Sequence, residues 1–446
     1  MSPVEVFCRI VGSCEYAYIL ESVEGPEKLA DYSFVGFEPC MVVRVKDGLV
    51  EVQDMVDGRR DACRTRDPLR LVKGLVGRLQ CREVFPSRFV GGAVGYLSYD
   101  AVRYWERLPE KAADDFKFPD LELAIYNDGL FFDHRRGQAY YYHYGVDRAR
   151  MVEEMIRTEP QHEPLSFSGL RSNVGKERFE EIVARSKEYI ASGDIFQVVL
   201  SRRFDFNFGG SLIPFYMALR KINPSPYMYF LKMGDRQIVG SSPEMLVRVE
   251  NGIVETYPIA GTRPRVPDDP AKDLALAEEL RNDPKECAEH VMLVDLARND
   301  IGRVCEYGSV HVPELMKVYK YSHVQHMVSR VVGRLRRDLS CYDALKAVFP
   351  AGTVTGAPKV RAMEIIEEFE PVRRGPYAGA VGYFSFNGNA DFAITIRTLV
   401  ASGRRAYIQA GAGVVADSIP EREWFETEHK ASALLKALQM ASAGEE

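Results

Sequence analysis

The amino-acid sequence predicts an α+β fold in which antiparallel sheets carry most of the structure. Two tight turns, Asp47-Gly48 and Asn251-Gly252, each join two stretches of alternating apolar residues, which is typical of β-hairpins. Segments with apolar residues at helical spacing lie between the predicted strands, and residues 176–192 are one example. With 446 residues, the chain can bury a large core, either as two or three domains or as one composite fold.

Residues 1–158 are expected to form a sheet-rich N-terminal region. Residues 41–46 and 49–52 are the arms of its clearest hairpin, and residues 127–129 and 136–137 mark further turns. The region therefore reads as a series of short antiparallel strands.

A polar segment with two prolines, residues 159–173, is predicted to be a linker. The second region, residues 174–440, begins with the helix over 176–192, which Gly193 ends. A strand over residues 194–206 follows. Alternation along this strand directs Gln197, Val199 and Ser201 to its more polar face. Gln197 is therefore a candidate site residue, with a surface glutamine as the alternative.

The second predicted hairpin pairs residues 245–250 with residues 253–258 across Asn251-Gly252. Extending its register places Glu244 opposite Ile259. We therefore expect Glu244, Ala260 and Thr262 to cluster at the open end of the hairpin.

Two stretches of the sequence are repeated. Residues 92–99 resemble residues 379–386, and residues 44–52 resemble residues 248–256. The two offsets differ, so the chain is not a simple tandem array. One hypothesis is two related sheet halves separated by insertions, and the alternative is that similar hairpins use similar residues.

A helix is predicted to begin at the sequence Asp283-Pro284, which has the form of an N-cap followed by the first helical residue. Glu286 stands three residues after the cap, as in a capping box. The helix is expected to run to about Arg298, and Gly302 is its stop signal.

Glu286 and Glu289 are three residues apart on this helix, so both carboxylates project from one face. Glu423 and Glu426 repeat the spacing at the start of a C-terminal helix. Two pairs of carboxylates on two helices favour a hard divalent cation such as Mg²⁺ if they converge. A solvated acidic face is the alternative for each pair alone.

Composition excludes several classes of function. The net charge is −6, from 58 basic and 64 acidic residues, so nothing favours nucleic acid as a partner. No apolar run reaches the length of a membrane span, and the N-terminus lacks the features of a signal peptide. The eight cysteines are scattered and contain no Cys-x-x-Cys pair, so we expect reduced thiols in a cytoplasmic protein.

The C-terminal quarter is rich in candidate ligand-binding residues. Residues 351–359 form a glycine-bearing loop that enters a helix, an arrangement that suits an anion, although the spacing is not that of a nucleotide P-loop. A strand over 391–400 carries Arg397. Gly411 and Gly413 alternate in a later strand, where they let backbone N–H groups approach a ligand.

Five long motifs, in order, resemble those of the chorismate-utilising enzymes, and most closely those of the large subunits of anthranilate synthases. The motifs are Pro-Ile-Ala-Gly-Thr-Arg-Pro-Arg (258–265), Ala-Glu-His-Val-Met-Leu-Val-Asp-Leu-Ala-Arg-Asn-Asp (288–300), Gly-Thr-Val-Thr-Gly-Ala-Pro-Lys-Val-Arg-Ala-Met (352–363), Gly-Ala-Val-Gly-Tyr-Phe (379–384) and Gln-Ala-Gly-Ala-Gly-Val-Val-Ala-Asp-Ser (409–418). The resemblance is dense over residues 174–440 and looser before them. It implies a β-sandwich of large antiparallel sheets with helices outside, in four layers.

The resemblance implies Mg²⁺-dependent addition of ammonia to C2 of chorismate, followed by loss of pyruvate to give anthranilate in tryptophan biosynthesis. Related isochorismate and salicylate synthases carry a lysine base where this chain has Gln197. Aminodeoxychorismate synthases typically carry a lysine where it has Ala260. An aminodeoxychorismate synthase of the folate pathway is the alternative enzyme, and a non-catalytic regulatory subunit is the alternative outside enzymes.

The resemblance also implies roles for individual residues. Glu244 would be the general acid, His326 would assist proton removal and pyruvate loss, and Gln197 would receive ammonia. Further residues would bind the substrate or line its pocket: Thr262, Thr353, Tyr383, Arg397, Gly411, Gly413 and Lys430. Mg²⁺ would be held by Glu286, Glu289, Glu423 and Glu426. His323, close to His326, is expected to be a surface histidine.

Regulation and assembly are implied as well. Ile19-Leu20-Glu21-Ser22 resembles a tryptophan-inhibition motif, and residues 223–228 resemble the segment that completes that pocket. The implied inhibitor-binding residues are Glu21, Ser22, Pro226, Tyr227 and Met228. The chain lacks a recognisable glutaminase motif, so a separate glutamine amidotransferase subunit is expected to supply ammonia, in a heterotetramer.

Overall fold

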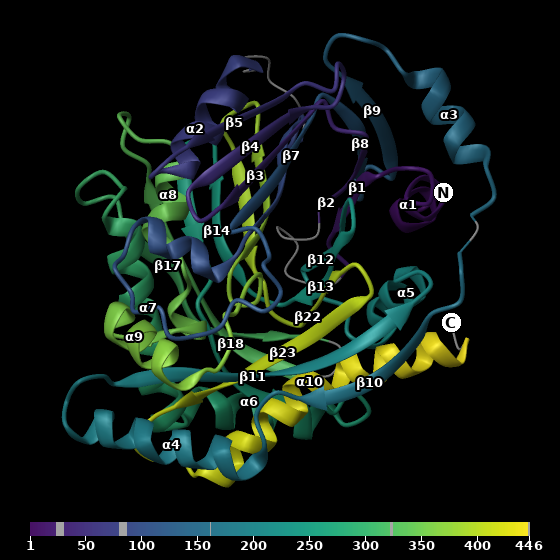
Figure 1. The fold of residues 1–446 in the computed structure, drawn as a ribbon. Helices are drawn as coiled ribbons and strands as arrows, with labels where there is room; N and C mark the ends of the chain where they lie inside the picture. The colour runs from purple at the N-terminus through teal and green to yellow at the C-terminus, as the bar shows by residue number, and fades with distance from the viewer. Residues whose placement is uncertain (24–30, 80–86, 161, 322–323, 445–446) are drawn as a thin grey trace.

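The structure is a computed structural model of the chain, and it describes residues 1–23, 31–79, 87–160, 162–321 and 324–444. Two large sheets face each other, and helices cover their outer faces (Figure 1). Every strand pair within the two sheets is antiparallel; an example is the pair between β1 (Tyr16–Glu21) and β12 (Tyr227–Met233). The predicted α+β class is confirmed.

The first sheet has eleven strands among the described residues, and β19 pairs with β11 beside the main path. Along that path the strands are β10 (Ser166–Ser172), β11 (Gln197–Gly209), β23 (Arg405–Val414), β22 (Thr398–Ser402), β13 (Arg236–Ser242), β12, β1, β2 (Tyr32–Phe37), β8 (Asp128–Asp133) and β9 (Gln138–His143); β19 is Gly356–Ala357.

The second sheet has twelve strands in the described part of the chain, and β17 pairs with β18 beside the main path. Along the path they are β16 (Ile259–Pro264), β18 (Val324–Arg334), β15 (Ile253–Thr256), β14 (Met245–Glu250), β21 (Ala390–Ile394), β20 (Ala380–Ser385), β6 (Gly92–Leu97), β7 (Leu121–Tyr126), β3 (Met41–Lys46), β4 (Leu49–Asp54) and β5 (Arg60–Arg64); β17 is His311–Lys320.

Helices form the two outer layers. The core outside the first sheet includes α1 (Pro3–Ile10), α3 (Ala149–Arg157), α5 (Ile213–Ile222) and α10 (Pro420–Ala443). The core outside the second sheet includes α2 (Pro68–Val76), α7 (Pro284–Gly302) and α8 (Cys341–Val348). α4 (Lys176–Ala191) and α9 (Lys359–Phe369) pack with β11 and β23, and α6 (Pro270–Asn282) lies beside β16. Three short 3₁₀ helices are also present among the described residues, at Gly77–Leu79, Tyr99–Tyr104 and Gly352–Val354.

The space between the sheets is filled by an aromatic core to which both sheets contribute. On β1, Tyr16 and Tyr18 enter this core, whereas the alternate residues Ala17 and Ile19 face the outer helices. β20 of the other sheet behaves in the same way, with Val381 and Tyr383 inside and Phe384 outside. Both faces of each sheet are therefore buried, and the four-layer sandwich is confirmed.

The repeated sequences occupy equivalent places in the second sheet. β6 and β20, which carry the repeated residues 92–97 and 380–385, pair with each other, and Gly95 lies opposite Gly382. Outward from this pair, the strand order is β7, β3, β4 on one side and β21, β14, β15 on the other. This symmetry supports the hypothesis of two related halves.

Both Asx-Gly hairpins form with the predicted register, Lys46 opposite Leu49 and Glu250 opposite Ile253. Positive φ angles at Asp47 (48°) and Asn251 (51°), each followed by a glycine, fit the tight turn. The predicted bounds of some other strands differ from those in the structure. Strands that lie far along the chain pair with them and decide where they begin and end.

Three predictions about connections require correction. Residues 128–129 are part of β8 rather than a turn, since the chain crosses from one sheet to the other after Tyr126. Residues 166–172 of the predicted linker form β10, which pairs with β11. The predicted strand over 391–400 is two strands in different sheets, β21 and β22, and Arg397 lies at the crossing between them.

α7 begins as predicted but extends to Gly302. Asp283 accepts hydrogen bonds from the N–H groups of Lys285 and Glu286. The Glu286 side chain, however, pairs with Arg263 rather than completing a capping box.

Candidate active site

One cavity of about 620 Å³ brings together almost all the predicted catalytic, substrate and metal residues. The predicted residues that line it are Gln197, Glu244, Thr262, Glu286, Glu289, His326, Thr353, Arg397, Gly411, Gly413, Glu423, Glu426 and Lys430. They come from strands of both sheets and from α7 and α10. The convergence of the two glutamate pairs, which the sequence alone left open, is present.

Tyr383 is the exception and requires correction. Its ring lies in the aromatic core between the sheets and lines a different cavity, because β20 directs this residue inward between the sheets. Tyr377 lines the active-site cavity instead. The two tyrosines are six residues apart, one just before the motif of residues 379–384 and one within it. The sequence offered little to distinguish them.

Glu244 directly precedes β14, and its Oε1 accepts a hydrogen bond of 2.8 Å from Thr353 Oγ1. Burial raises the pKa of Glu244 to about 7, although the hydrogen bond from Thr353 and the charge of Lys430 act in the opposite direction. A carboxyl group with this pKa holds a proton near neutral pH and can act as a general acid.

Gln197 begins β11 and is buried against β23. A Cβ atom on Gly413 would lie 2.7 Å from Gln197 Nε2, so glycine at this position makes room for the amide. A Cβ atom on Gly411 would lie 2.8 Å from the Tyr377 hydroxyl. The two alternating glycines therefore allow Gln197 and Tyr377 to pack beside a bare strand.

His326 lies on β18 and packs beside Thr262 of β16. Its Nδ1 lies 3.0 Å from Thr262 Oγ1 and 3.2 Å from the carbonyl oxygen of Gly261. Donation from Nδ1 to that carbonyl leaves Nε2 as the basic nitrogen. Burial lowers the pKa of His326, so the imidazole is neutral and can accept a proton.

Arg397 and Lys430 form the cationic part of the cavity. Arg397 Nη1 donates to the carbonyl oxygen of Lys430 at 2.7 Å, and no carboxylate pairs with the guanidinium within the described residues. Lys430 Nζ pairs with Glu426 at 2.6 Å and donates to the carbonyl oxygen of Gly411 at 3.0 Å. Arg397 is therefore available for an anionic ligand.

The four glutamates concentrate negative charge in the cavity, and Glu426 among them pairs with Lys430. Burial raises the pKa of Glu289, and repulsion from Glu286 adds to the effect. Burial likewise raises the pKa of Glu423, whose buried Oε2 has no hydrogen-bond partner in the described part of the chain. A cation between the pairs would relieve both the repulsion and the missing contact.

The donor set fits Mg²⁺ rather than a metal that needs a closed protein cage. Among the residues that the structure describes, no three His, Cys, Asp or Glu side chains already form a metal-binding group. Mg²⁺ commonly takes one or two carboxylates and keeps waters or substrate oxygens as its other ligands. Glu286, Glu289, Glu423 and Glu426 can provide such an incomplete shell.

A second, narrow cavity of about 50 Å³ lies between the sheets. It is lined by all five predicted inhibitor-binding residues, Glu21, Ser22, Pro226, Tyr227 and Met228. Glu21 accepts hydrogen bonds from Tyr216 and Arg220, whereas the buried Ser22 hydroxyl has no partner among the described residues. Asp391, bonded to the Tyr227 hydroxyl at 3.0 Å and to Arg248 at 2.7 Å, provides its polar wall.

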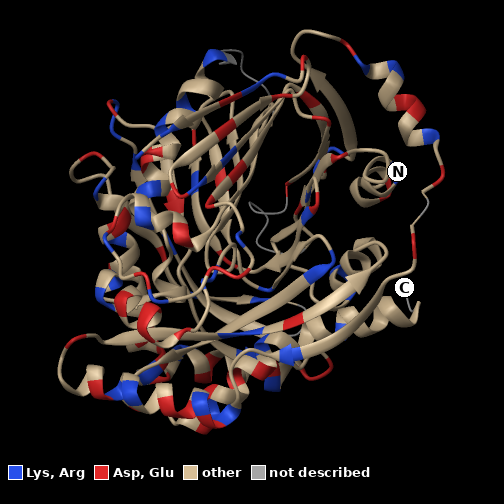
Figure 2. Ribbon diagram, viewed as in Figure 1, with Lys and Arg blue, Asp and Glu red and all other residues tan. Residues whose placement is uncertain are grey.

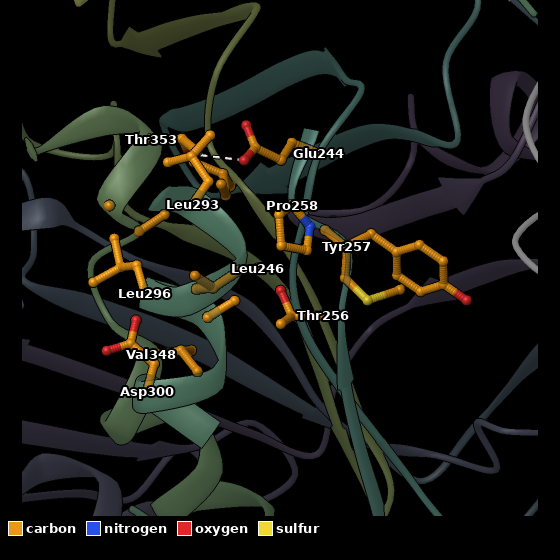
Figure 3. A pocket seen from close by; sticks show the side chains of 15 residues that line it. Glu244, Leu246, Thr256, Tyr257, Pro258, Leu293, Leu296, Asp300, Val348 and Thr353 are labelled. Carbon is orange, nitrogen blue, oxygen red and sulfur yellow. Dashed lines mark hydrogen bonds between the residues drawn. The ribbon is translucent and has the colours of Figure 1, made fainter. Parts of the chain in front are cut away.

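A third cavity, also of about 50 Å³, lies behind the Glu244–Thr353 hydrogen bond (Figure 3). Apolar side chains such as Leu246, Leu293 and Leu296 form most of its wall, and Asp300 also lines it. It shares Glu244, Leu293 and Thr353 with the active-site cavity, so these three residues separate the two spaces.

Residues 17–436 match the family model described as chorismate binding enzyme. The chain belongs to the chorismate-binding enzyme family. This chorismate-binding enzyme is 48% identical over 443 residues to anthranilate synthase component 1 of Methanothermobacter thermautotrophicus, an alignment that covers 99% of the chain and 93% of the relative. It is 44% identical to the same component of Aquifex aeolicus, covering 100% of the chain and 94% of the relative.

Solved structures agree with this assignment. Anthranilate synthase component I from Streptococcus pneumoniae matches with a TM-score of 0.80 and 38% identity, covering 92% of this chain and 93% of that chain. The menaquinone-specific isochorismate synthase from Escherichia coli matches with a TM-score of 0.73 and 20% identity, covering 98% of this chain and 92% of that one, which reflects the fold alone.

Some expectations concern parts of the chain away from the cavity. His323 lies outside the described residues. The seven cysteines that the structure describes are free thiols. No helix in the described ranges is long and apolar enough to cross a membrane. Acidic and basic residues alternate along the ribbon, for example in α4 (Figure 2), in keeping with the small net charge of −6.

Proposed function

We propose that this chain is the chorismate-converting component of an anthranilate synthase. It adds ammonia to C2 of chorismate and then eliminates pyruvate to leave anthranilate. The observation that carries this proposal is a single cavity in which an acid, a neutral amide and a neutral histidine, namely Glu244, Gln197 and His326, lie beside two pairs of carboxylates.

In the first step Glu244 gives its proton to the C4 hydroxyl group, which leaves as water. Thr353 fixes the orientation of the carboxyl group through their 2.8 Å hydrogen bond. A pKa of about 7 makes the proton available at neutral pH without making the acid too weak to donate it.

Gln197 receives ammonia, which is already a nucleophile and needs no base. An amide can accept a hydrogen bond from ammonia while leaving its lone pair free for C2. Gln197 is therefore suited to amination, whereas activation of water would require a basic side chain.

The second step requires removal of the C2 proton as the C3–O bond to the enolpyruvyl group breaks. His326 is the base for this step, since its Nδ1 is directed to Gly261 and Thr262 and its Nε2 is left to accept a proton. Pyruvate leaves with the electron pair of the broken bond, and the ring becomes aromatic.

Arg397 and the backbone at Gly411 and Gly413 hold the enolpyruvyl carboxylate. The guanidinium offers two parallel N–H groups, which match a carboxylate. Glu286, Glu289, Glu423 and Glu426 would hold Mg²⁺, which would supply Lewis-acid polarisation of the substrate when bound.

The alternative product, 4-amino-4-deoxychorismate, is disfavoured by the environment of residue 260. Ala260 lines the cavity, so that position supplies no amine for covalent attack at C2. Direct addition of ammonia at C2 is then the route that the residues support.

The test is incubation of the chain with chorismate, Mg²⁺ and an ammonium salt, with the product identified by fluorescence and chromatography. Ortho-aminobenzoate and pyruvate in equal amounts are expected. The 4-amino compound would favour the alternative, and unchanged chorismate would contradict an enzymatic role for the chain.

We propose further that the narrow cavity beside Glu21 and Ser22 binds L-tryptophan as a feedback inhibitor. The support is the convergence of both predicted segments on one cavity. The Ser22 hydroxyl, which has no partner among the described residues, and the Asp391 carboxylate are available as polar contacts for an amino acid. Ammonia is expected from a glutamine amidotransferase partner in a heterotetramer, and analytical ultracentrifugation of the two chains together would test this assembly.

A further inference from the structure

The segment 349–358 joins α8 to α9, and we call it the active-site loop. Thr353 of this loop donates to Glu244. Farther along, Ala357 and Gly356 pair with Gln197 and Val198 at the start of β11. One loop therefore contacts both the proposed acid and the residue proposed to receive ammonia.

Lys359 ties the two ends of this loop together. Its Nζ donates to the carbonyl oxygen of Val348 at 3.0 Å, and Val348 is the residue directly before the loop. The same ammonium group pairs with Asp300 of α7 at 2.9 Å. A single cation thus closes the loop and attaches it to the helix that carries two of the glutamates.

The ion pair between Lys359 and Asp300 lies away from the reacting groups. Asp300 and Val348 line the third cavity, which lies behind Glu244. In Figure 3 both residues lie at a distance from the Glu244–Thr353 hydrogen bond. Lys359 is not among the residues that line the active-site cavity. Its side chain and that of Asp300 are 15% and 14% exposed, so solvent screens their attraction only in part.

The other side of the loop is also fixed. Buried Arg374 donates to the carbonyl oxygens of Val354 in the loop and Val199 in β11, at 2.7 and 2.8 Å. With both sides anchored, Thr353 has little freedom to leave Glu244. Small displacements of a catalytic group reduce rates strongly, because the reaction depends on alignment.

We infer that Lys359 and Asp300 are positioning residues, which hold the active-site loop so that Thr353 stays hydrogen-bonded to Glu244. This inference rests on the proposed function.

The hydrogen bond between Thr353 and Glu244 also affects the pH dependence of the reaction. The hydrogen bond from Thr353 lowers the pKa of Glu244, so its loss raises that pKa and the acid stays protonated to higher pH. The other charged or titratable groups that line the active-site cavity are Lys285, Glu286, Glu289, His326, Arg397, Glu423, Glu426 and Lys430, and Asp300 lies behind. Removing only Lys359 would leave Asp300 as an unpaired anion, so both charges must be removed together.

The experiment compares the wild-type chain with Asp300→Asn/Lys359→Met, Thr353→Val, the combination of all three substitutions, and Lys359→Arg. We expect the paired variant to lose about tenfold or more in kcat, with KM for chorismate changed by less than about twofold. The basic limb of its kcat–pH profile moves to higher pH. Thr353→Val shows the same shift, and the triple variant is no slower than Thr353→Val.

Lys359→Arg keeps the cation and is expected to recover most of the rate. Lys46→Met is the matched control. Lys46 lies on β3, far from the loop in sequence, and forms partly buried ion pairs with Asp114 and Asp120. Thermal melting of every variant shows whether it folds, and if the paired variant does not fold, Asp300→Asn/Lys359→Gln, which also removes both charges, is compared with Lys359→Arg.

Additive losses in the triple variant, or a pH profile that does not move, would overturn the inference, as would an equal loss in Lys46→Met. Failure of the wild-type chain to form anthranilate would instead overturn the proposed function. An active wild-type chain with a fully active paired variant would overturn only the positioning role.

Discussion

Glu244 must keep a proton at neutral pH and then give it up, and its surroundings explain how. Burial favours the neutral acid and raises the pKa to about 7, whereas Thr353 and Lys430 limit the rise. The sequence placed Glu244 near Ala260 and Thr262 by hairpin register. The structure reaches the same cluster by a different pairing, since β16 leaves the hairpin and pairs with β18.

Glu244→Gln removes the transferable proton and should lower kcat by about 10²–10⁴-fold. In the wild-type chain, kcat should fall as pH rises above about 7, because the acid loses its proton there. Stopped-flow and steady-state assays across pH 6–9 measure both effects. Full turnover by the variant at neutral pH would show that another group is the acid.

His326→Ala should separate the two chemical steps. Amination does not need the imidazole, so the variant should accumulate aminodeoxyisochorismate and form little pyruvate. Chromatography of quenched reactions identifies the compound. A block before amination would assign His326 to the first step instead.

The contrast between Tyr383 and Tyr377 shows where residue-level prediction stops. Motifs identify which stretch lies at a site, because they are local. Which of two nearby tyrosines faces the cavity depends on the sheet face that each occupies, and only the three-dimensional pairing of β20 decides this.

At the scale of elements, α7 and α10 bring two glutamate pairs to one cavity. Helix start signals and i, i+3 spacing were readable from the sequence because they involve neighbouring residues. The distance between the helices was not, since it depends on the sheets that lie between them in the fold. The crossing of the chain between β21 and β22, which places Arg397 at the cavity, was missed for the same reason.

Removal of divalent cations should abolish turnover, because the glutamate pairs then repel the substrate carboxylate. Glu423→Gln keeps the shape of one member and should raise the Mg²⁺ concentration for half-maximal activity about tenfold or more. Titration of activity with Mg²⁺ after chelation measures this. Glu421→Gln, a neighbouring exposed glutamate that pairs with Lys176, is the control. Equal metal requirements in both variants would contradict the assignment.

Gly413→Ala should disturb β23 and β11 together, since the new methyl group would lie 2.7 Å from Gln197 Nε2. We expect the KM for ammonium to rise more than the KM for chorismate. Gly403→Ala lies in a turn with open space around it but with a φ of 58°, so it reports the cost of backbone strain alone. A Gly413→Ala variant with an unchanged ammonium KM would argue against the role of Gln197.

At the scale of the whole molecule, the second sheet is built from two similar halves joined at β6 and β20. Residues of β21 line the narrow cavity beside Glu21 and Ser22, and β22 begins just after Arg397 in the active-site cavity. β14, which follows Glu244, carries Arg248 at the wall of the narrow cavity. Residues of β14 and β21 therefore line the narrow cavity, and residues directly before β14 and β22 line the active-site cavity, which gives a physical route for coupling between the two.

L-Tryptophan should bind with a measurable heat in isothermal titration and should lower the rate of anthranilate formation. Ser22→Phe fills part of the narrow cavity and should weaken this binding by more than about tenfold. Thr353→Val, whose position does not line the narrow cavity, should bind tryptophan normally. Equal binding by both variants would place the inhibitor elsewhere.

The most direct test of the central claim is a reaction with chorismate, Mg²⁺ and ¹⁵N-labelled ammonium, followed by mass spectrometry and NMR of the products. The account predicts one ¹⁵N atom in the ortho amino group of anthranilate, one pyruvate for each anthranilate, and no product after chelation of Mg²⁺. Label at the position para to the carboxylate, or label-free hydroxylated product, would contradict it.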